Sequence, residues 1–299
     1  MFAQEVHLLS ESWQKSISAR ARLPLLATFA LTYAATQRPS GAAAGTRERF
    51  LVCYSRDDLA AIQNYDLAVL DSDIDADLSG RQNPAAILLG YLSLGELHRG
   101  RGYFPDVSRD GVLFDANPNW PDAQFVDMRA ARWRDRIVTQ LVPAILARGF
   151  SGLFFDTLDN AEFLETRNPV RFSGMVEGAA DLVRSVRHHF PNVPIMINRG
   201  YAVLPRIAGK FDMLLGESVR TTFDAKSRSY QLVSEAGYLW QVERMRRARE
   251  RDPHLRLFSL DYWDPEDRDG IARIYTGQRA NSFIPYVGTF DLTSIVTEP

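Results

Sequence analysis

The sequence predicts an α/β fold, a (β/α)8 TIM barrel that forms a single domain. Short continuous apolar runs recur along the chain, and most of them end on a carboxylate, an amide or a hydroxyl. Such runs are typical of strands that are buried on both faces of a parallel sheet. Stretches with helical spacing separate most of the runs, which favours a parallel sheet with helical crossovers. Residues 46–291 come close to the about 250 residues that such a barrel needs.

Eight strands are expected, at residues 50–54, 67–71, 85–93, 152–156, 194–198, 212–217, 255–261 and 281–286. Helices are expected between them, at residues 57–64, 130–148, 172–190, 201–208, 229–251 and 265–277. The helix over 130–148 carries apolar residues at helical spacing and ends before Gly149, a suitable C-cap. The helix over 172–190 ends before Pro191. The connection over 95–124 is rich in Gly, Pro and aromatic residues, and so long a connection is typically functional or disordered.

The first 45 residues form a leader that precedes the barrel domain of residues 46–299. Arg20 and Arg22 come before a short apolar stretch at 23–35, and small residues follow at 36–45. This order is typical of a secretory signal, and the apolar stretch is too short for an ordinary membrane span. We therefore expect export to the periplasm or the medium. The alternative is a helix packed on the barrel of a cytoplasmic protein, because acidic residues in the long leader are unusual for a signal.

Composition excludes several function classes. The formal net charge is −2, which provides no basic surface for nucleic acid. Cys53 is the single cysteine, so neither an internal disulfide nor a cysteine metal site can form. Of the histidines only His98 falls near a predicted strand end, so we expect no metal site. No lysine ends a strand and no dinucleotide fingerprint or P-loop is present, so we expect no cofactor. A monomer is expected.

Asp156 and Glu217 are the candidate catalytic residues. Each ends a predicted strand, the fourth and the sixth, and barrel enzymes place their chemistry at the carboxyl ends of strands. Glycoside hydrolysis commonly uses such a pair of carboxylates. A helix cap is an equal alternative for Asp156, because Asp is common at strand–helix turns. That alternative is weaker for Glu217, because Glu is a poor N-cap.

Further polar and aromatic residues fall on the same predicted rim. The acids repel each other unless a cation binds, so a cationic or amino-sugar substrate would account for them; the alternative is that each caps a loop. The aromatic rings suit stacking on sugars, with ordinary packing as the alternative. The candidate substrate-binding residues are Tyr54, Asp71, Asp73, Tyr91, Glu96, Asn198, Arg199, Tyr201, Asp261, Tyr262 and Tyr286.

Several segments together resemble two glycosidase families. Residues 91–96 (YLSLGE), 125–129 (FVDMR) with 133–135 (WRD), and 149–159 (GFSGLFFDTLD) are similar to the pattern of glycoside hydrolase family 114. Residues 198–200 (NRG) and 216–218 (GES) resemble family 166, the family of the hydrolase domain of Pel exopolysaccharide proteins. The resemblance covers nearly all of residues 50–291.

The resemblance implies a (β/α)8 barrel that acts as an endo-α-1,4-hydrolase on galactosamine or N-acetylgalactosamine polymers. It places the catalytic pair on Asp156 and Glu217. By analogy with other α-retaining barrel glycosidases, Asp156 is expected to be the nucleophile and Glu217 the acid/base. Two alternatives stay open, a non-catalytic polysaccharide-binding barrel and a glycosidase for another α-linked glycan.

Overall fold

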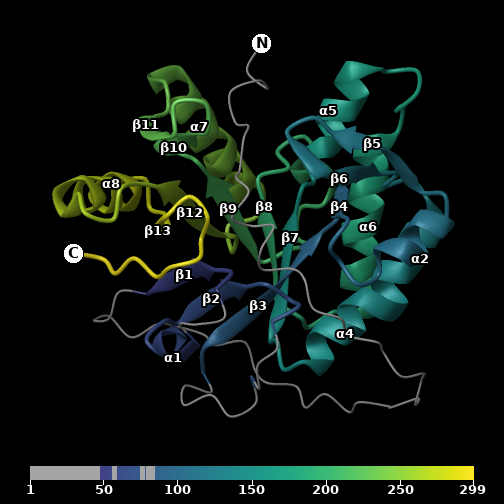
Figure 1. The fold of residues 1–299 in the computed structure, drawn as a ribbon, viewed down its shortest axis with the longest axis horizontal. Coiled ribbons are helices and arrows are strands. Elements are labelled where there is room, and N and C mark those ends of the chain that lie inside the picture. The colour runs from purple at the N-terminus through teal and green to yellow at the C-terminus, as the bar shows by residue number, and fades with distance from the viewer. Residues whose placement is uncertain (1–47, 56–58, 75–77, 79–84) are drawn as a thin grey trace.

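Eight parallel strands form the central sheet of the computed structural model (Figure 1). The structure describes residues 48–55, 59–74, 78 and 85–299. The sheet order is β1 (Phe50–Cys53), β2 (Leu67–Leu70), β3 (Ile87–Ser93), β7 (Gly152–Asp156), β8 (Ile195–Asn198), β9 (Met213–Glu217), β12 (Arg256–Tyr262) and β13 (Ile284–Gly288). Chain order and sheet order coincide, and β1 lies beside β13. The predicted (β/α)8 barrel is therefore confirmed, and its sheet is nearly closed.

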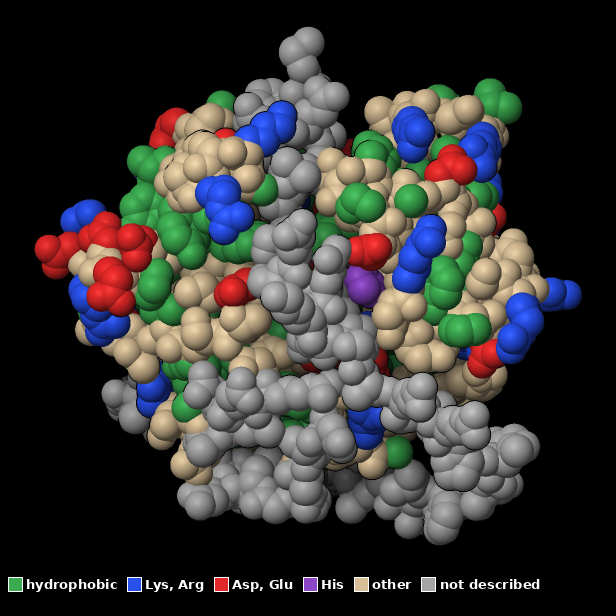
Figure 2. Space-filling model, in the orientation of Figure 1, with side chains coloured by type: hydrophobic (Ala, Val, Ile, Leu, Met, Phe, Trp, Pro, Cys, Tyr) green, Lys and Arg blue, Asp and Glu red, His purple; other side chains and the backbone are tan. Residues whose placement is uncertain are grey.

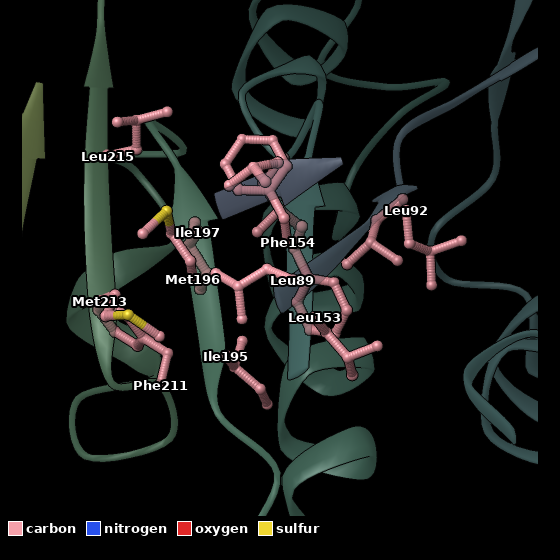
Figure 3. Packing of buried hydrophobic residues seen from close by; sticks show 14 of the residues in the cluster. Leu89, Leu92, Leu153, Phe154, Ile195, Met196, Ile197, Phe211, Met213 and Leu215 are labelled. Carbon is pink, nitrogen blue, oxygen red and sulfur yellow. The ribbon is translucent and has the colours of Figure 1, made fainter. Parts of the chain in front are cut away.

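The strands form because their side chains are apolar on both faces. The residues of β1, β2 and β8 are all buried. One face of each strand fills the barrel and the other packs under the helices, as parallel sheets require. Figure 3 shows how neighbouring strands pack, with buried Leu89, Phe154, Ile197 and Leu215 on β3, β7, β8 and β9. This continuous core holds the strand ends in fixed positions.

Helices cover the outside of the sheet (Figure 1). They are α1 (Leu59–Ile62), α2 (Phe104–Arg109), α3 (Ala131–Arg136), α4 (Val142–Ala147), α5 (Asn160–Arg167), α6 (Met175–His189), α7 (Glu235–Arg251) and α8 (Arg268–Ala280). The helix expected over 130–148 is divided by a π-helical turn, Ile137–Leu141. Pro143 follows this turn and lacks the N–H that a regular α-helix would use there, which accounts for the wider turn.

Two expected elements differ from the observed ones. The long helix expected over 229–251 begins only at Glu235, because the Ser234 hydroxyl caps it by accepting a hydrogen bond from the Gly237 N–H. The residues before it form β11 (Ser229–Leu232), which pairs with β10 (Thr221–Asp224) in an antiparallel hairpin. Residues 201–208, expected to be a helix, contain only a 3₁₀ turn at Leu204–Arg206.

The long connection after β3 contains its own small sheet. Strands β4 (Glu96–His98), β6 (Trp120–Val126) and β5 (Leu113–Asn117) pair antiparallel in that order. Val126 N–H donates to the Gly95 carbonyl (2.9 Å), which attaches the small sheet to the end of β3. The sheet therefore forms one wall above the carboxyl ends of the barrel strands.

The leader predicted at residues 1–45 lies outside the described residues, so the expected export stays a prediction. Within the part of the chain that the structure describes, no helix combines the length and the apolar character needed to cross a membrane.

Candidate active site

A cavity opens at the carboxyl ends of the barrel strands. It encloses about 1340 Å³, part of which is open to solvent. Five acidic side chains line it together with aromatic, amide and basic groups. In Figure 2, acidic side chains (red) lie beside a histidine (purple) over the region of β4. The lining residues used below are Tyr54, Tyr91, Glu96, Arg101, Asn117, Asp156, Thr157, Asp159, Asn160, Asn198, Arg199, Glu217, Tyr262 and Asp291.

Asp156 and Glu217 meet in this cavity through a shared amide. Asn198 Nδ2 donates to Asp156 Oδ1 (2.9 Å) and to Glu217 Oε2 (2.6 Å). The two oxygens are therefore at most 5.5 Å apart, the sum of these distances. Tyr91 Oη donates to Asp156 Oδ2 (2.8 Å), and Tyr262 Oη donates to Glu217 Oε1 (2.7 Å). Each of the four carboxylate oxygens thus accepts one hydrogen bond.

These five side chains come from five neighbouring strands. Tyr91 is on β3, and Asp156, Asn198 and Glu217 end β7, β8 and β9; Tyr262 ends β12. Because β8 lies between β7 and β9, its terminal amide is placed between the two carboxylates. Successive side chains of a strand point to opposite faces of the sheet. The last residue of a strand can therefore take part in catalysis only when its side chain faces the barrel axis.

The chain turns sharply after each of the three central strands. Thr157, Arg199 and Ser218 directly follow the strand ends and have positive φ angles of 64°, 51° and 51°. L-residues seldom adopt this conformation, and a β-branched residue such as Thr does so rarely. Hydrogen bonds hold the first of these turns, since Thr157 Oγ1 accepts from the Gly95 N–H (2.8 Å) and donates to the Asp156 carbonyl (2.7 Å). Such local strain is concentrated at functional sites, where the surrounding structure maintains it.

Burial and charge change the protonation of the site. The pKa of Asp156 is raised to about 7, first because the carboxyl is removed from water and then because Glu217 and Asp159 are negative neighbours. The hydrogen bonds from Tyr91 and Asn198 oppose this rise, since they stabilise the ionised form. Two carboxylates this close titrate as a pair. The pair therefore retains a proton toward neutral pH.

A second, partly buried carboxylate lies on the wall formed by the small sheet. Glu96 Oε2 accepts from Asn117 Nδ2 (2.7 Å) and from Asn160 Nδ2 (3.1 Å). Burial raises the pKa of Glu96, and the two amides reduce this rise. The amides come from β5 and α5, so the wall is connected to the barrel at this carboxylate.

Arg101 is a cavity residue that sequence reasoning missed. Its guanidinium is 5% exposed and donates to Asp71 Oδ1 (2.7 Å) and Asp73 Oδ2 (2.8 Å). It also lies over the ring of Tyr91, 5.5 Å from the centroid. The predicted residues Asp71 and Asp73 do not line the cavity but neutralise this arginine behind it. Arg101 comes from a Gly- and Arg-rich loop without periodicity, so only a functional reading of the long connection could have suggested it.

Five predicted substrate-binding residues line the cavity besides Asn198, namely Tyr54, Tyr91, Glu96, Arg199 and Tyr262. Arg199 Nη1 lies 3.9 Å from Asp159 Oδ2. The two catalytic candidates also lie there together. The expected rim position is thus observed for these residues, while their contacts with substrate stay a prediction.

Three predicted rim residues lie elsewhere, and their expected place in the site is not observed. Asp261 is completely buried and faces away from the cavity, because its neighbours Leu260 and Tyr262 line it. The carboxylate accepts hydrogen bonds from two backbone N–H groups and from a glutamine. Tyr201 is buried and donates to Gln241 Oε1 (3.0 Å) on α7.

Tyr286 is the third of these residues. It is completely buried, and its hydroxyl accepts from the Val296 N–H (3.3 Å). Its ring packs at 6.3 Å, edge to face, with that of Phe50. The side chain therefore stabilises the junction of β1 and β13 instead of the cavity wall.

The described residues hold no group of three or more His, Cys, Asp and Glu side chains placed to bind a metal ion. The carboxyl groups in the cavity can carry out proton transfer and nucleophilic attack. A pair with one retained proton can supply both an acid and an anion to the same bond.

Comparisons with known proteins identify the fold and the family. Solved structures with this fold include the glycoside hydrolase domain of PelA from Pseudomonas aeruginosa, with a TM-score of 0.74 and 23% identity. They also include Aspergillus fumigatus Ega3 in complex with galactosamine, with a TM-score of 0.63 and 14% identity. The first alignment covers 85% of this chain and 98% of that domain, and the second covers 90% and 100%. A search of curated proteins gave no match. The model of glycoside hydrolase family GH114 matches residues 31–298. The chain therefore belongs to glycoside hydrolase family 114, as its sequence motifs indicated.

Proposed function

We propose that this protein is an endo-acting glycosidase that cleaves α-1,4-linked galactosamine or N-acetylgalactosamine polysaccharides with retention of configuration. The main support for a retaining mechanism is the pair of hydrogen bonds that Asn198 Nδ2 donates to the two acids. It limits the nearest carboxylate oxygens of Asp156 and Glu217 to 5.5 Å. Retaining enzymes hold their carboxyl groups about 5–5.5 Å apart, and inverting enzymes about 6.5–9.5 Å.

The roles follow the two steps of a retaining reaction. Glu217 donates a proton to the glycosidic oxygen while Asp156 attacks the anomeric carbon, forming a glycosyl-enzyme and releasing the leaving chain. Glu217, now ionised, then takes a proton from the water that displaces Asp156. Asp156 must be ionised to attack. A cationic sugar or the positive charge that develops at the anomeric carbon lowers its pKa from about 7 and favours this form.

Charge supports an amino-sugar substrate. The acids that line the cavity are Glu96, Asp156, Asp159, Glu217 and Asp291, against the cations Arg101 and Arg199. Arg101 is neutralised by two carboxylates behind the wall. The excess of negative charge favours an ammonium group over an anion. The galactosamine present in the Ega3 complex supports the same substrate class.

The first experiment is digestion of partly deacetylated galactosaminan. We expect shorter oligosaccharides of several lengths by mass spectrometry, which is the pattern of endo cleavage. Asp156→Asn and Glu217→Gln should abolish cleavage. The control is Glu243→Gln, which should cleave normally because Glu243 is an exposed helix residue that pairs with Arg247. Binding without fragments would favour a non-catalytic polysaccharide-binding barrel. Cleavage of another α-linked glycan in a parallel panel would redirect the substrate assignment.

The stereochemistry and roles have a separate test. Proton NMR of the first product should show the α-anomer, and a β-anomer would mean inversion. An activated galactosaminyl fluoride should leave an adduct on Asp156 of the Glu217→Gln variant. An adduct on a different carboxylate would overturn the nucleophile assignment. We also propose that the monomer is active, which sedimentation of the active enzyme would test.

A further inference from the structure

Asn198 uses its amide group in an unusual way. Asn198 is 5% exposed, and both hydrogens of its Nδ2 point to the carboxylates of Asp156 and Glu217. Its Oδ1 atom is buried and has no hydrogen-bond partner among the described residues. A buried acceptor without a donor destabilises the fold. The amide keeps this orientation because rotation would turn Oδ1 toward the two carboxyl groups and remove both of these hydrogen bonds.

We propose that Asn198 is a positioning residue that holds Asp156 and Glu217 at a fixed separation, and that it does not bind the sugar. Of the three donors to the pair, Tyr91 contacts one carboxylate and Tyr262 contacts the other. Asn198 alone among them contacts both. This inference rests on the proposed function, because it concerns the same two acids.

The geometry leaves Asn198 little to offer a substrate. Its two hydrogens are engaged, and its Oδ1 has almost no accessible surface. Arg199, Glu96 and Tyr54 line the same cavity. The sequence suggested substrate binding for Asn198, and the hydrogen-bond pattern assigns it to the enzyme's own acids instead.

The amide also offsets the repulsion between the two acids. Its hydrogen bond lowers the pKa of Asp156, against the effects of burial and of Glu217. Removing it should therefore raise that pKa. The charged or titratable groups that face the pair are Tyr54, Tyr91, Asp159, Arg199 and Tyr262. They come from the residue after β1, from β3, from the turns after β7 and β8, and from β12.

The test compares Asn198→Ala with Asn117→Ala. Both residues are buried asparagines, 5% and 4% exposed, and each donates to a cavity carboxylate. Titration of Asp156, followed by NMR of ¹³C-labelled carboxyl carbons and assigned with Asp156→Asn, needs no substrate. This titration therefore tests the role of Asn198 even if galactosaminan is not the glycan that this enzyme cleaves.

We expect Asn198→Ala to raise the Asp156 midpoint by about one pH unit, from the usual strength of a hydrogen bond to a charged group. The value of kcat should fall about 100-fold with little change in KM, since misplacement of reacting groups has that effect. Asn117→Ala should leave the Asp156 midpoint unchanged. Asn198→Asp preserves the shape of the side chain and adds a third negative charge, so it should raise the midpoint further.

An unchanged Asp156 midpoint in Asn198→Ala would overturn the proposal. So would a variant in which KM rises and kcat is preserved, because that is the signature of a lost sugar contact.

Discussion

Replacing Asp261 separates a structural role from the substrate-binding role that its position at a strand end suggested. The carboxylate accepts from the Arg220 N–H (2.6 Å), the Thr221 N–H (2.8 Å) and Gln278 Nε2 (2.6 Å). It thereby fixes the start of the β10–β11 hairpin and one face of α8. Asp261→Asn keeps an acceptor for the two backbone groups, and rotation of the Gln278 amide can pair the new NH₂.

The magnitude follows from the pKa of the buried group. Burial raises the pKa of Asp261 to about 6, compared with about 3.9 in an unfolded chain. The folded state therefore binds this proton more tightly than the unfolded state does. Its contribution to stability is largest below about pH 4 and is lost as the pH rises to about 6. The difference of about two pKa units corresponds to about 3 kcal/mol.

The contribution of Asp261 to stability can be measured by urea unfolding at several pH values between 4 and 7. The wild-type protein and Asp261→Asn are compared at each pH. We expect the free energy of unfolding of the variant, minus that of the wild type, to increase by about 2 kcal/mol between pH 4 and 7, since part of the full effect lies below pH 4. Other titrating groups, Asp156 included, cancel in this difference. The variant should also retain its kcat and KM. A difference that does not change with pH would refute the linkage argument, and a large rise in KM would return Asp261 to the substrate-binding residues.

Two further predictions concern β3 and the turn that follows it. Tyr91→Phe removes one hydrogen-bond donor to Asp156, so the acidic limb of the pH profile of kcat/KM should move to higher pH by about one unit. An unmoved limb would show that this hydrogen bond does not determine the protonation of Asp156. Gly95→Ala should lower the melting temperature by several degrees and reduce kcat, because a Cβ there would overlap the Thr157 carbonyl. Gly102→Ala is the control, since a Cβ at Gly102 meets nothing within 4 Å; equal melting temperatures for the two variants would contradict the steric argument.

Much of the site follows from the order of apolar runs in the chain. Each run is long enough for one buried strand, and parallel strands joined by helices present all their carboxyl ends on one face. The polar residues that end β7, β8 and β9, namely Asp156, Asn198 and Glu217, were therefore expected to converge, and they do. The family motifs contain the same positions. The length of the connection over 95–124 indicated only that this segment is functional or disordered.

The direction of each side chain was decided by the tertiary structure. Successive residues of a strand point to opposite faces, so a shift of one residue moves a side chain from the cavity to the helical layer. Asp261 and Tyr262 show both outcomes side by side. Arg101 enters the site from a loop without periodicity, because its partners Asp71 and Asp73 are distant in sequence and meet it only in the folded chain. Local patterns determine which residues reach a strand end, whereas packing around the barrel determines which way they face.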